Sequence, residues 1–146
     1  MKIINETILI IDYGSQYTQL IARKIREQNV YCEVYPYNKI SSSILNNKDL
    51  SGIILSGGPN SVKDKQSPKL NKKILELKMP ILGICYGLQL LCKEFGGNIG
   101  QSSSREYGHS LITLKNKSKL LDGVKKKSQV WMSHGDHIQK APKDFT

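Results

Sequence analysis

The sequence has few cysteines, few arginines and no long apolar run. Only three cysteines occur in 146 residues, and their spacing suggests no pairing, which argues against a disulfide-held scaffold and favours a reducing compartment. Residues 1–6 hold no apolar run of signal-peptide length, and no segment approaches the roughly 20 apolar residues of a membrane helix. We therefore expect one cytoplasmic domain, without membrane contact and long enough to bury its own core.

Arginine is scarce although the chain is basic. The formal net charge is +10, yet only three of the 22 basic residues are arginines. Six lysines fall between Lys115 and Lys127, and no aromatic residue interleaves them, so the run lacks the stacking surface of a nucleic-acid site. We interpret it as a solvated loop or edge and expect no nucleic-acid partner; binding of anions or RNA is the alternative.

Apolar runs and helical patterns alternate up to Gly97. We expect strands at 7–11, 30–35, 52–55 and 81–84, helices at 17–26, 67–77 and 86–95, and a short helix or irregular connection at 41–47. The second of the longer helices would begin at Ser67-Pro68, and the third would bury a face that contains Leu88 and Phe95. This βαβ alternation predicts an α/β fold, a doubly wound and mostly parallel sheet.

The pattern changes after Gly97. Residues 111–114 and 129–132 read as strands with no helix between them, so we expect an antiparallel extension of the α/β domain. The predicted organisation is an N-terminal tail over residues 1–7 and one domain over residues 8–146.

Cys85 lies at a turn between a strand and a helix and is flanked by Gly83 and Gly87. Gly-x-Cys-x-Gly in this setting is typical of a nucleophile elbow. The helix N-terminus would stabilise the thiolate, and the N–H of Tyr86 would face a developing oxyanion. The alternative for Cys85 is a buried structural cysteine. Cys32 and Cys92 lack this setting and are expected in the core.

In a doubly wound fold the site lies at the carboxyl ends of the strands, here in the loops that follow Ile11, Leu55 and Ile84. A thiol nucleophile also needs a base, usually histidine. His134 lies in a predicted loop, residues 131–137, which we interpret as a structural or substrate-positioning turn. His109 is expected at the surface, and His137 has no predicted role.

Five segments match a known family in their residues and in their order along the chain: residues 12–17, 55–62, 83–89, 105–108 and 130–136. Together they resemble the class I glutamine amidotransferase domain of GMP synthetases. The resemblance implies a flavodoxin-like sheet and hydrolysis of glutamine through a thioester on Cys85. It further implies that the backbone N–H groups of Gly58 and Tyr86 form an oxyanion hole. The residues it places near the bound glutamine are Gln89, Ser133, Gly135 and Asp136.

The resemblance also implies partners. The ammonia would pass to a synthetase (ATP pyrophosphatase) domain, fused or separate, that uses ATP and Mg²⁺ to convert xanthosine monophosphate to GMP. The full-length enzyme would be a homodimer, and this chain itself would hold no cofactor and no metal. The segment from Ser56 to Ser61 superficially resembles the phosphate loop of ATP pyrophosphatases, but Pro59 removes a backbone donor from such a cradle.

One departure from the family pattern bears on activity. In the family, the base and its carboxylate come from a His-Pro-Glu segment, and none occurs in this sequence. Neither His134 nor His137 aligns with that base. We therefore expect a C-terminally incomplete domain, cut before that segment, with little glutaminase activity in residues 1–146 alone. Two alternatives are a catalytically silent module that binds glutamine or regulates a synthetase, and another cysteine-elbow protein such as a peptidase or chaperone-like relative.

Overall fold

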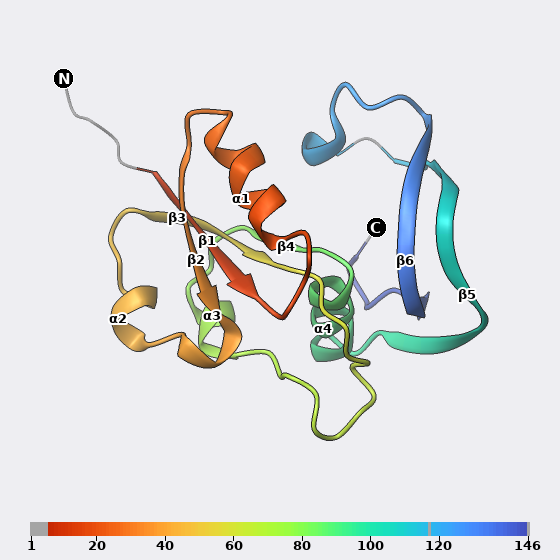
Figure 1. Ribbon diagram of the computed structural model, residues 1–146, viewed down its shortest axis with the longest axis horizontal. Helices are drawn as coiled ribbons and strands as arrows, with labels where there is room; N and C mark the ends of the chain where they lie inside the picture. The colour runs from red at the N-terminus through yellow and green to blue at the C-terminus, as the bar shows by residue number, and fades with distance from the viewer. Residues whose placement is uncertain (1–5, 117, 146) are drawn as a thin grey trace.

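The computed structural model describes residues 6–116 and 118–145, except for the side chains of residues 101–107, 133 and 134. The chain forms a parallel four-stranded sheet flanked by helices, together with an antiparallel strand pair beside them (Figure 1). The elements in chain order are β1 (Thr7–Asp12), α1 (Thr18–Arg26), β2 (Tyr31–Pro36), η1 (Tyr37–Lys39), α2 (Ser42–Leu45), β3 (Leu50–Leu55), α3 (Lys73–Glu76), β4 (Ile81–Gly83), α4 (Tyr86–Glu94), β5 (Asn98–Thr113), η2 (Lys119–Leu121) and β6 (Lys127–Lys140).

The four-stranded sheet has the order β2-β1-β3-β4, and every neighbouring pair is parallel. Ile10 of β1 lies opposite Val34 on one side and Ile54 on the other. This order is that of flavodoxin-like sheets, in which the connections reverse direction between β1 and β3. The predicted doubly wound α/β fold is confirmed.

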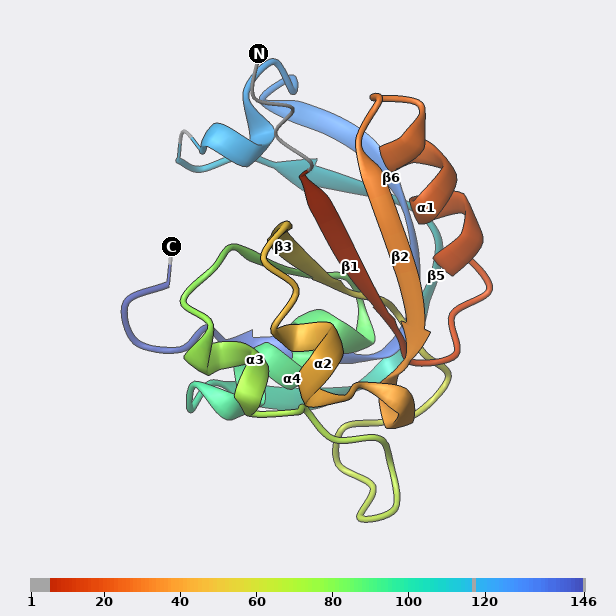
Figure 2. The same ribbon diagram turned by 90° about the vertical axis from the view of Figure 1, so that its left-hand side faces the viewer.

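Helices cover both faces of the sheet (Figure 2). On one face, Ile10 and Cys32 pack against Ala22 of α1. On the other, alternate residues of β1 and β3 pack against residues of α2, α3 and α4, among them Leu45, Ile74 and Leu91. Burial of strands on both sides explains their continuous apolar runs. Cys32 and Cys92 are both buried in these cores, as predicted.

The antiparallel extension is confirmed, and it is longer than the sequence predicted. Strands β5 and β6 pair from Asn98↔Lys140 to Thr113↔Lys127. The end of this hairpin nearest Gly97 approaches α4 (Figure 1). Ile99 is buried there, and Phe95 packs against Phe145 at a centroid separation of 5.3 Å. The described lysines between Lys115 and Lys127 are exposed, as expected of a solvated loop.

The helix predicted to start at Ser67-Pro68 is wrong, because α3 begins only at Lys73. The Ser67 hydroxyl donates to the Asp64 carbonyl at 2.6 Å and closes a turn there. The Pro68 carbonyl, which a helix would use internally, instead accepts the Tyr86 hydroxyl. Near the real start, the Asn71 side chain accepts the Lys73 N–H at 3.1 Å.

Two further predictions are corrected. Of the face predicted for α4, Leu91 and Cys92 are buried as expected, whereas Leu88 and Phe95 are 46% and 47% exposed. Tyr86 and Leu90 are buried in their place. His134 does not lie in a loop, because the backbone of residues 127–140 is continuous strand, with His134 opposite Glu106. Residues 105–108, also part of the resemblance, lie within β5.

Candidate active site

Cys85 stands at the N-terminus of α4 in a strained backbone conformation. Its φ is 48° and its ψ is −108°, a combination outside the left-handed well that side chains tolerate and one that costs about 1–3 kcal/mol. The residue is exposed, unlike Cys32 and Cys92. A strained, exposed cysteine between β4 and α4 matches the predicted nucleophile elbow, and the alternative of a buried structural cysteine does not fit.

The two flanking glycines are required by close approach rather than by unusual torsion angles. A Cβ atom on Gly83 would lie 2.6 Å from the backbone N and Cα of Leu88. A Cβ atom on Gly87 would lie 2.4 Å from the carbonyl oxygen of Leu55. Both contacts are shorter than van der Waals distances and involve backbone, so α4 can begin this close to β3 and β4 only with glycine at both positions.

The three predicted loops meet at the carboxyl edge of the sheet, and Ser56 links them. Its N–H donates to the Ile11 carbonyl at 3.0 Å, and its carbonyl accepts the Gly87 N–H at 3.0 Å. Its hydroxyl oxygen accepts the Tyr13 N–H at 2.9 Å. Ser56 is fully buried, so these bonds are shielded from water and hold the loops in one arrangement.

Asp12 organises the first of these loops. One carboxylate oxygen accepts the Gly14 N–H at 2.9 Å and the Thr18 hydroxyl at 2.8 Å. The Ser15 hydroxyl, held in this loop, would lie 3.5 Å from a Cβ atom placed on Gly57. The same Gly57 position lies 3.5 Å from the Cβ of Cys85. The loops after β1 and β3 therefore both border Cys85.

The two backbone N–H groups predicted to form an oxyanion hole belong to the loop after β3 and to the start of α4. Gly58 packs against the first loop so closely that a Cβ atom there would be 2.6 Å from the Tyr13 carbonyl oxygen. Tyr86 is the first residue of α4, where a helix leaves its N–H groups without internal acceptors. Among the hydrogen bonds of the described residues, neither N–H has a protein acceptor. Both donors remain available for a ligand.

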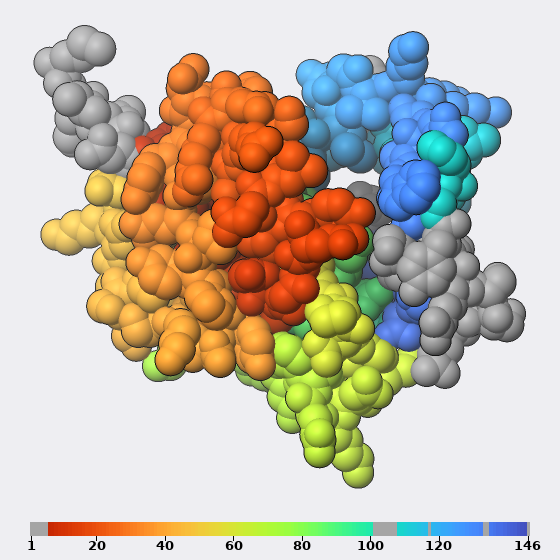
Figure 3. Space-filling model, viewed as in Figure 1, coloured from red at the N-terminus to blue at the C-terminus, as the bar shows by residue number. Residues whose placement is uncertain are grey.

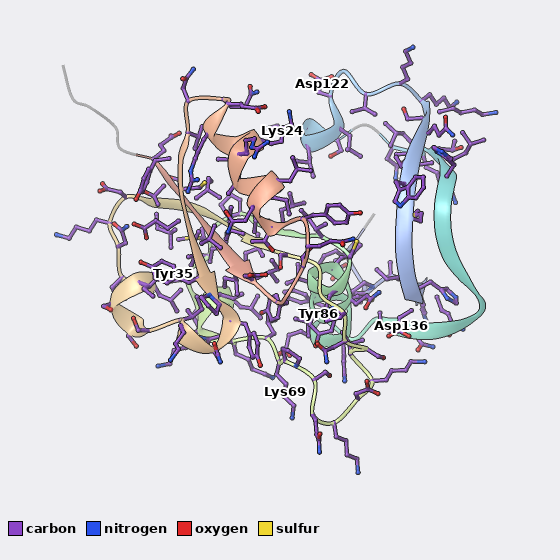
Figure 4. The ribbon with its side chains drawn as sticks, viewed as in Figure 1. Lys24, Tyr35, Lys69, Tyr86, Asp122 and Asp136 are labelled. Carbon is purple, nitrogen blue, oxygen red and sulfur yellow. The ribbon has the colours of Figure 1, made fainter. Side chains whose placement is uncertain are left out.

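Two of the predicted substrate residues come together at the foot of the hairpin. The Gln89 side chain donates from Nε2 to the Asp136 carbonyl at 3.0 Å, and the Ser61 hydroxyl donates to the Asp136 carboxylate at 2.5 Å. Gln89 is one turn after Cys85, since its N–H donates to the Cys85 carbonyl. Figure 4 shows Asp136 on β6 beside α4, which carries Tyr86. Gly135 is half-buried beside Asp136, and the side chain of Ser133 lies outside the described residues.

Burial raises the pKa of the Cys85 thiol above its ordinary value. The sequence predicted the opposite bias, because a helix N-terminus favours the thiolate. No charged group among the described residues contributes to the shift, so desolvation decides its direction. The thiol is therefore mainly protonated at neutral pH and needs a base.

The described histidines do not supply that base. His109 is exposed and packs edge-on against Trp131, with ring centroids 4.8 Å apart. His137 follows Asp136 in β6, and consecutive strand residues point to opposite faces. Its side chain therefore lies on the face away from the Asp136–Ser61 contact. The side chain of His134 lies outside the described residues.

Sequence reasoning missed the residues that hold the site together, which are Asp12, Tyr13, Ser56 and Ser61. All four belong to segments that carry the family resemblance, but no role was predicted for them from the sequence. The available signal was position, since Asp12 and Ser56 directly follow or end buried strands that are neighbours in the sheet. Among the described residues, no group of three or more histidine, cysteine or acidic side chains is placed to hold a metal ion.

Comparison with known proteins places this arrangement in a family. The family described as "Glutamine amidotransferase class-I" matches residues 9–146. The chain belongs to the class-I glutamine amidotransferase family. A cysteine at a strand-to-helix elbow, with glycine-bordered loops beside it, is thus the candidate site of this amidotransferase domain.

Curated relatives of this amidotransferase domain are named GMP synthase [glutamine-hydrolyzing]. The protein of Natranaerobius thermophilus is 49% identical over 96% of this chain, and that of Caldanaerobacter subterraneus is 51% identical over 99%. The chain spans only 27% and 28% of these two relatives. A solved structure from Thermoplasma acidophilum, of a candidate GMP synthase subunit, has a TM-score of 0.79 and 29% identity, and the match covers 97% of this chain and 70% of that one.

Proposed function

We propose that this domain is the glutaminase part of a GMP synthase and that Cys85 is its nucleophile. The observation that carries the proposal is the elbow. It holds an exposed cysteine at φ 48°, next to two backbone N–H groups that have no acceptor among the described residues. The names of the relatives, glutamine-hydrolysing GMP synthases, support glutamine as the substrate.

In the proposed reaction, the Cys85 sulfur attacks the side-chain amide carbon of glutamine. The carbon–sulfur bond forms while the carbonyl π electrons move to oxygen, and the N–H groups of Gly58 and Tyr86 stabilise that oxyanion. The oxyanion collapses, the carbon–nitrogen bond breaks, and ammonia leaves with the proton taken from the thiol. Water then cleaves the glutamyl thioester to glutamate and regenerates the thiol.

We propose that the binding side of the site is built at the hairpin foot. Gln89, Ser133, Gly135 and Asp136 border the glutamine, with Asp136 suited to its α-ammonium group. Asp136 is buried and its carboxylate is fixed by Ser61, which supports a preorganised contact rather than a mobile surface acid.

The base is proposed to come from outside residues 1–146. Burial raises the pKa of the Cys85 thiol, so the reaction needs a proton acceptor. The His-Pro-Glu motif of the family does not occur in this sequence. The relatives are several times longer than the matched part, so they have room for such a segment. Residues 8–146 would then be most of one domain, which also includes Thr7, the first residue of β1.

The ammonia would be used by an ATP-dependent synthetase that converts xanthosine monophosphate to GMP, in a cytoplasmic homodimer. We assign ATP and Mg²⁺ to that synthetase and not to this chain, because Pro59 interrupts the N–H groups that a phosphate cradle would need. Within the described residues, no helix is both long and apolar enough to cross a membrane.

The test is glutamine hydrolysis by the protein at its natural length. Cys85→Ala is expected to lower kcat by at least about 10³-fold, since a nucleophile cannot be replaced by its neighbours. Cys92→Ala is the matched control, because it removes a thiol that is buried seven residues away in the same helix; it should keep kcat within about 3-fold. Glutamine binding without hydrolysis in the unmodified protein would favour the silent-module alternative. Hydrolysis that survives Cys85→Ala would refute the proposal.

A further inference from the structure

Tyr13 contacts both residues that carry the proposed oxyanion donors, Gly58 and Tyr86. It is 2% exposed and lies in the loop after β1. Its carbonyl oxygen would be 2.6 Å from a Cβ atom on Gly58, and its own Cβ would be 3.3 Å from the same point. Its backbone therefore packs directly against the segment that carries one proposed oxyanion donor.

The ring of Tyr13 packs against the side chain of Tyr86, the residue that carries the other proposed donor. Its centroid is 5.5 Å from that of Tyr86, with the planes inclined at 52°. Tyr37 closes the cluster from the outside, stacked on Tyr13 at 5.6 Å and 11°. The Tyr86 ring is fixed at its far end, because its hydroxyl donates to the Pro68 carbonyl. Aromatic stacking of this kind fixes both distance and orientation.

Tyr13 is itself held in place on the Gly58 side. Its N–H donates to the buried Ser56 hydroxyl at 2.9 Å, and Ser56 accepts the N–H of Gly87 through its carbonyl. A closed circuit results, from Tyr13 through Ser56 to the start of α4 and back through the Tyr86 ring. Tyr13 thus contacts the residues that carry both proposed donors: Gly58 through its backbone and Cβ, and Tyr86 through its ring.

The hydroxyl of Tyr13 has no role in this circuit. It is buried, and it has no hydrogen-bond partner among the residues the structure describes. Burial, with the Tyr86 phenol as a lesser cause, raises the pKa of the Tyr13 phenol far above its ordinary value, so the group stays neutral. Packing by the ring is thus separable from any chemistry of the hydroxyl.

We propose that Tyr13 is a positioning residue that sets the spacing of the Gly58 and Tyr86 N–H groups in the oxyanion hole. This inference rests on the proposed function. It requires that changes to the ring affect only reactions that place negative charge on a carbonyl oxygen. Attack on glutamine is such a reaction. Alkylation of Cys85 by iodoacetamide is not, because the thiolate attacks a methylene carbon and iodide leaves.

The experiment compares these two reactions in the protein at its natural length. Tyr13→Leu removes the ring and is expected to lower kcat for glutamine about 10- to 100-fold, with KM and the rate of iodoacetamide alkylation each within about 3-fold. Tyr13→Phe keeps the ring and should restore kcat. Tyr13→Met gives a second ringless variant should Tyr13→Leu fail to fold.

Ile10→Ala is the matched control for lost core packing. Ile10 is fully buried on the α1 face of β1, the strand that precedes Tyr13, so this variant should destabilise the fold without lowering kcat. Equal losses of hydrolysis and alkylation in Tyr13→Leu, an unchanged kcat, or no rescue by Tyr13→Phe would overturn the inference. If the unmodified protein fails to hydrolyse glutamine, the proposed function is wrong and the inference falls with it.

Discussion

The α/β body and the β5–β6 hairpin have opposite architectures. In the body, Ile10, Leu55 and Ile74 are completely buried, and the loops at the sheet edge are joined by hydrogen bonds around a buried serine. In the hairpin, Leu111 and Trp131 are 75% and 63% exposed, although the backbone pairing is extensive. Figure 3 shows an open gap between α1 and the hairpin.

The proposed catalytic groups lie in one region and a proposed substrate contact lies in the other. The proposed nucleophile and both proposed oxyanion donors lie in the body, where burial and close contacts fix them within small tolerances. The hairpin contributes Asp136 at its foot, the part where it is attached to α4. We therefore expect substitutions in the body to act on folding and catalysis together, and most substitutions in the hairpin to change neither.

The largest contrast is expected from loss of apolar volume. Ile74→Ala leaves a cavity in the body core and should lower the free energy of unfolding by about 3 kcal/mol. Leu111→Ala changes a side chain that is mostly in water and should alter it by less than about 0.5 kcal/mol. Urea unfolding followed by circular dichroism measures both. Similar losses for the two variants would show that the hairpin has a core of its own.

Glycine substitutions sharpen the comparison at the backbone. Gly87→Ala forces a Cβ atom to within 2.4 Å of the Leu55 carbonyl and should cost about 2 kcal/mol through displacement of α4. Gly135→Ala places its Cβ in open space and should cost less than about 0.5 kcal/mol. Thermal unfolding midpoints give the result. A tolerated Gly87→Ala would mean that the elbow does not need its close approach.

The joint between the two regions is probed by Gln89. Gln89→Leu leaves the buried Asp136 carbonyl without its donor and should cost about 1–2 kcal/mol. Trp131, the single tryptophan, lies in the hairpin. In Gln89→Leu, its fluorescence should therefore change at a lower urea concentration than the circular dichroism of the body. Gln129→Leu, at an exposed hairpin position, is the control. Coincident transitions in Gln89→Leu would contradict an attachment through this bond.

The smallest effect concerns the pH dependence of Cys85. Since burial raises the folded pKa of the thiol, residues 1–146 should react with iodoacetamide half-maximally at a higher pH than a free cysteine does. By linkage, the stability that Cys85 contributes is present below its unfolded pKa and is lost as pH rises through the folded pKa. Cys85→Ala removes the signal. A midpoint below that of free cysteine would mean that the helix N-terminus outweighs desolvation.

Much of the body could be predicted from sequence because its signals are local. The apolar run from Thr7 to Ile11 can only be buried on both faces, and the glycines around Cys85 mark a turn with no room for side chains. The start of α3 could not be predicted, because it depends on the Pro68 carbonyl accepting a hydroxyl from Tyr86, 18 residues away. The direction of the pKa shift of Cys85 likewise depends on the partial burial of the thiol in the folded chain.

The site was predictable in part for the same reason. Cys85 is identified by its neighbours in sequence, whereas the ties made by Ser56 and Ser61 span 43 and 75 residues and appear only in the fold. The extent of β6 was also missed, since residues 133–136 look like turn material and are held extended by their pairing with β5.

The most direct measurement of the central claim is mass spectrometry of Cys85 after brief incubation of the natural-length protein with glutamine and quenching in acid. We predict a glutamyl adduct on the peptide that contains Cys85 and none on the peptides of Cys32 or any other residue. The adduct should be absent in Cys85→Ala, and neutral hydroxylamine, which cleaves thioesters, should remove it from the unmodified protein. Steady hydrolysis of glutamine with no adduct on Cys85, or an adduct on a different residue, would contradict the account.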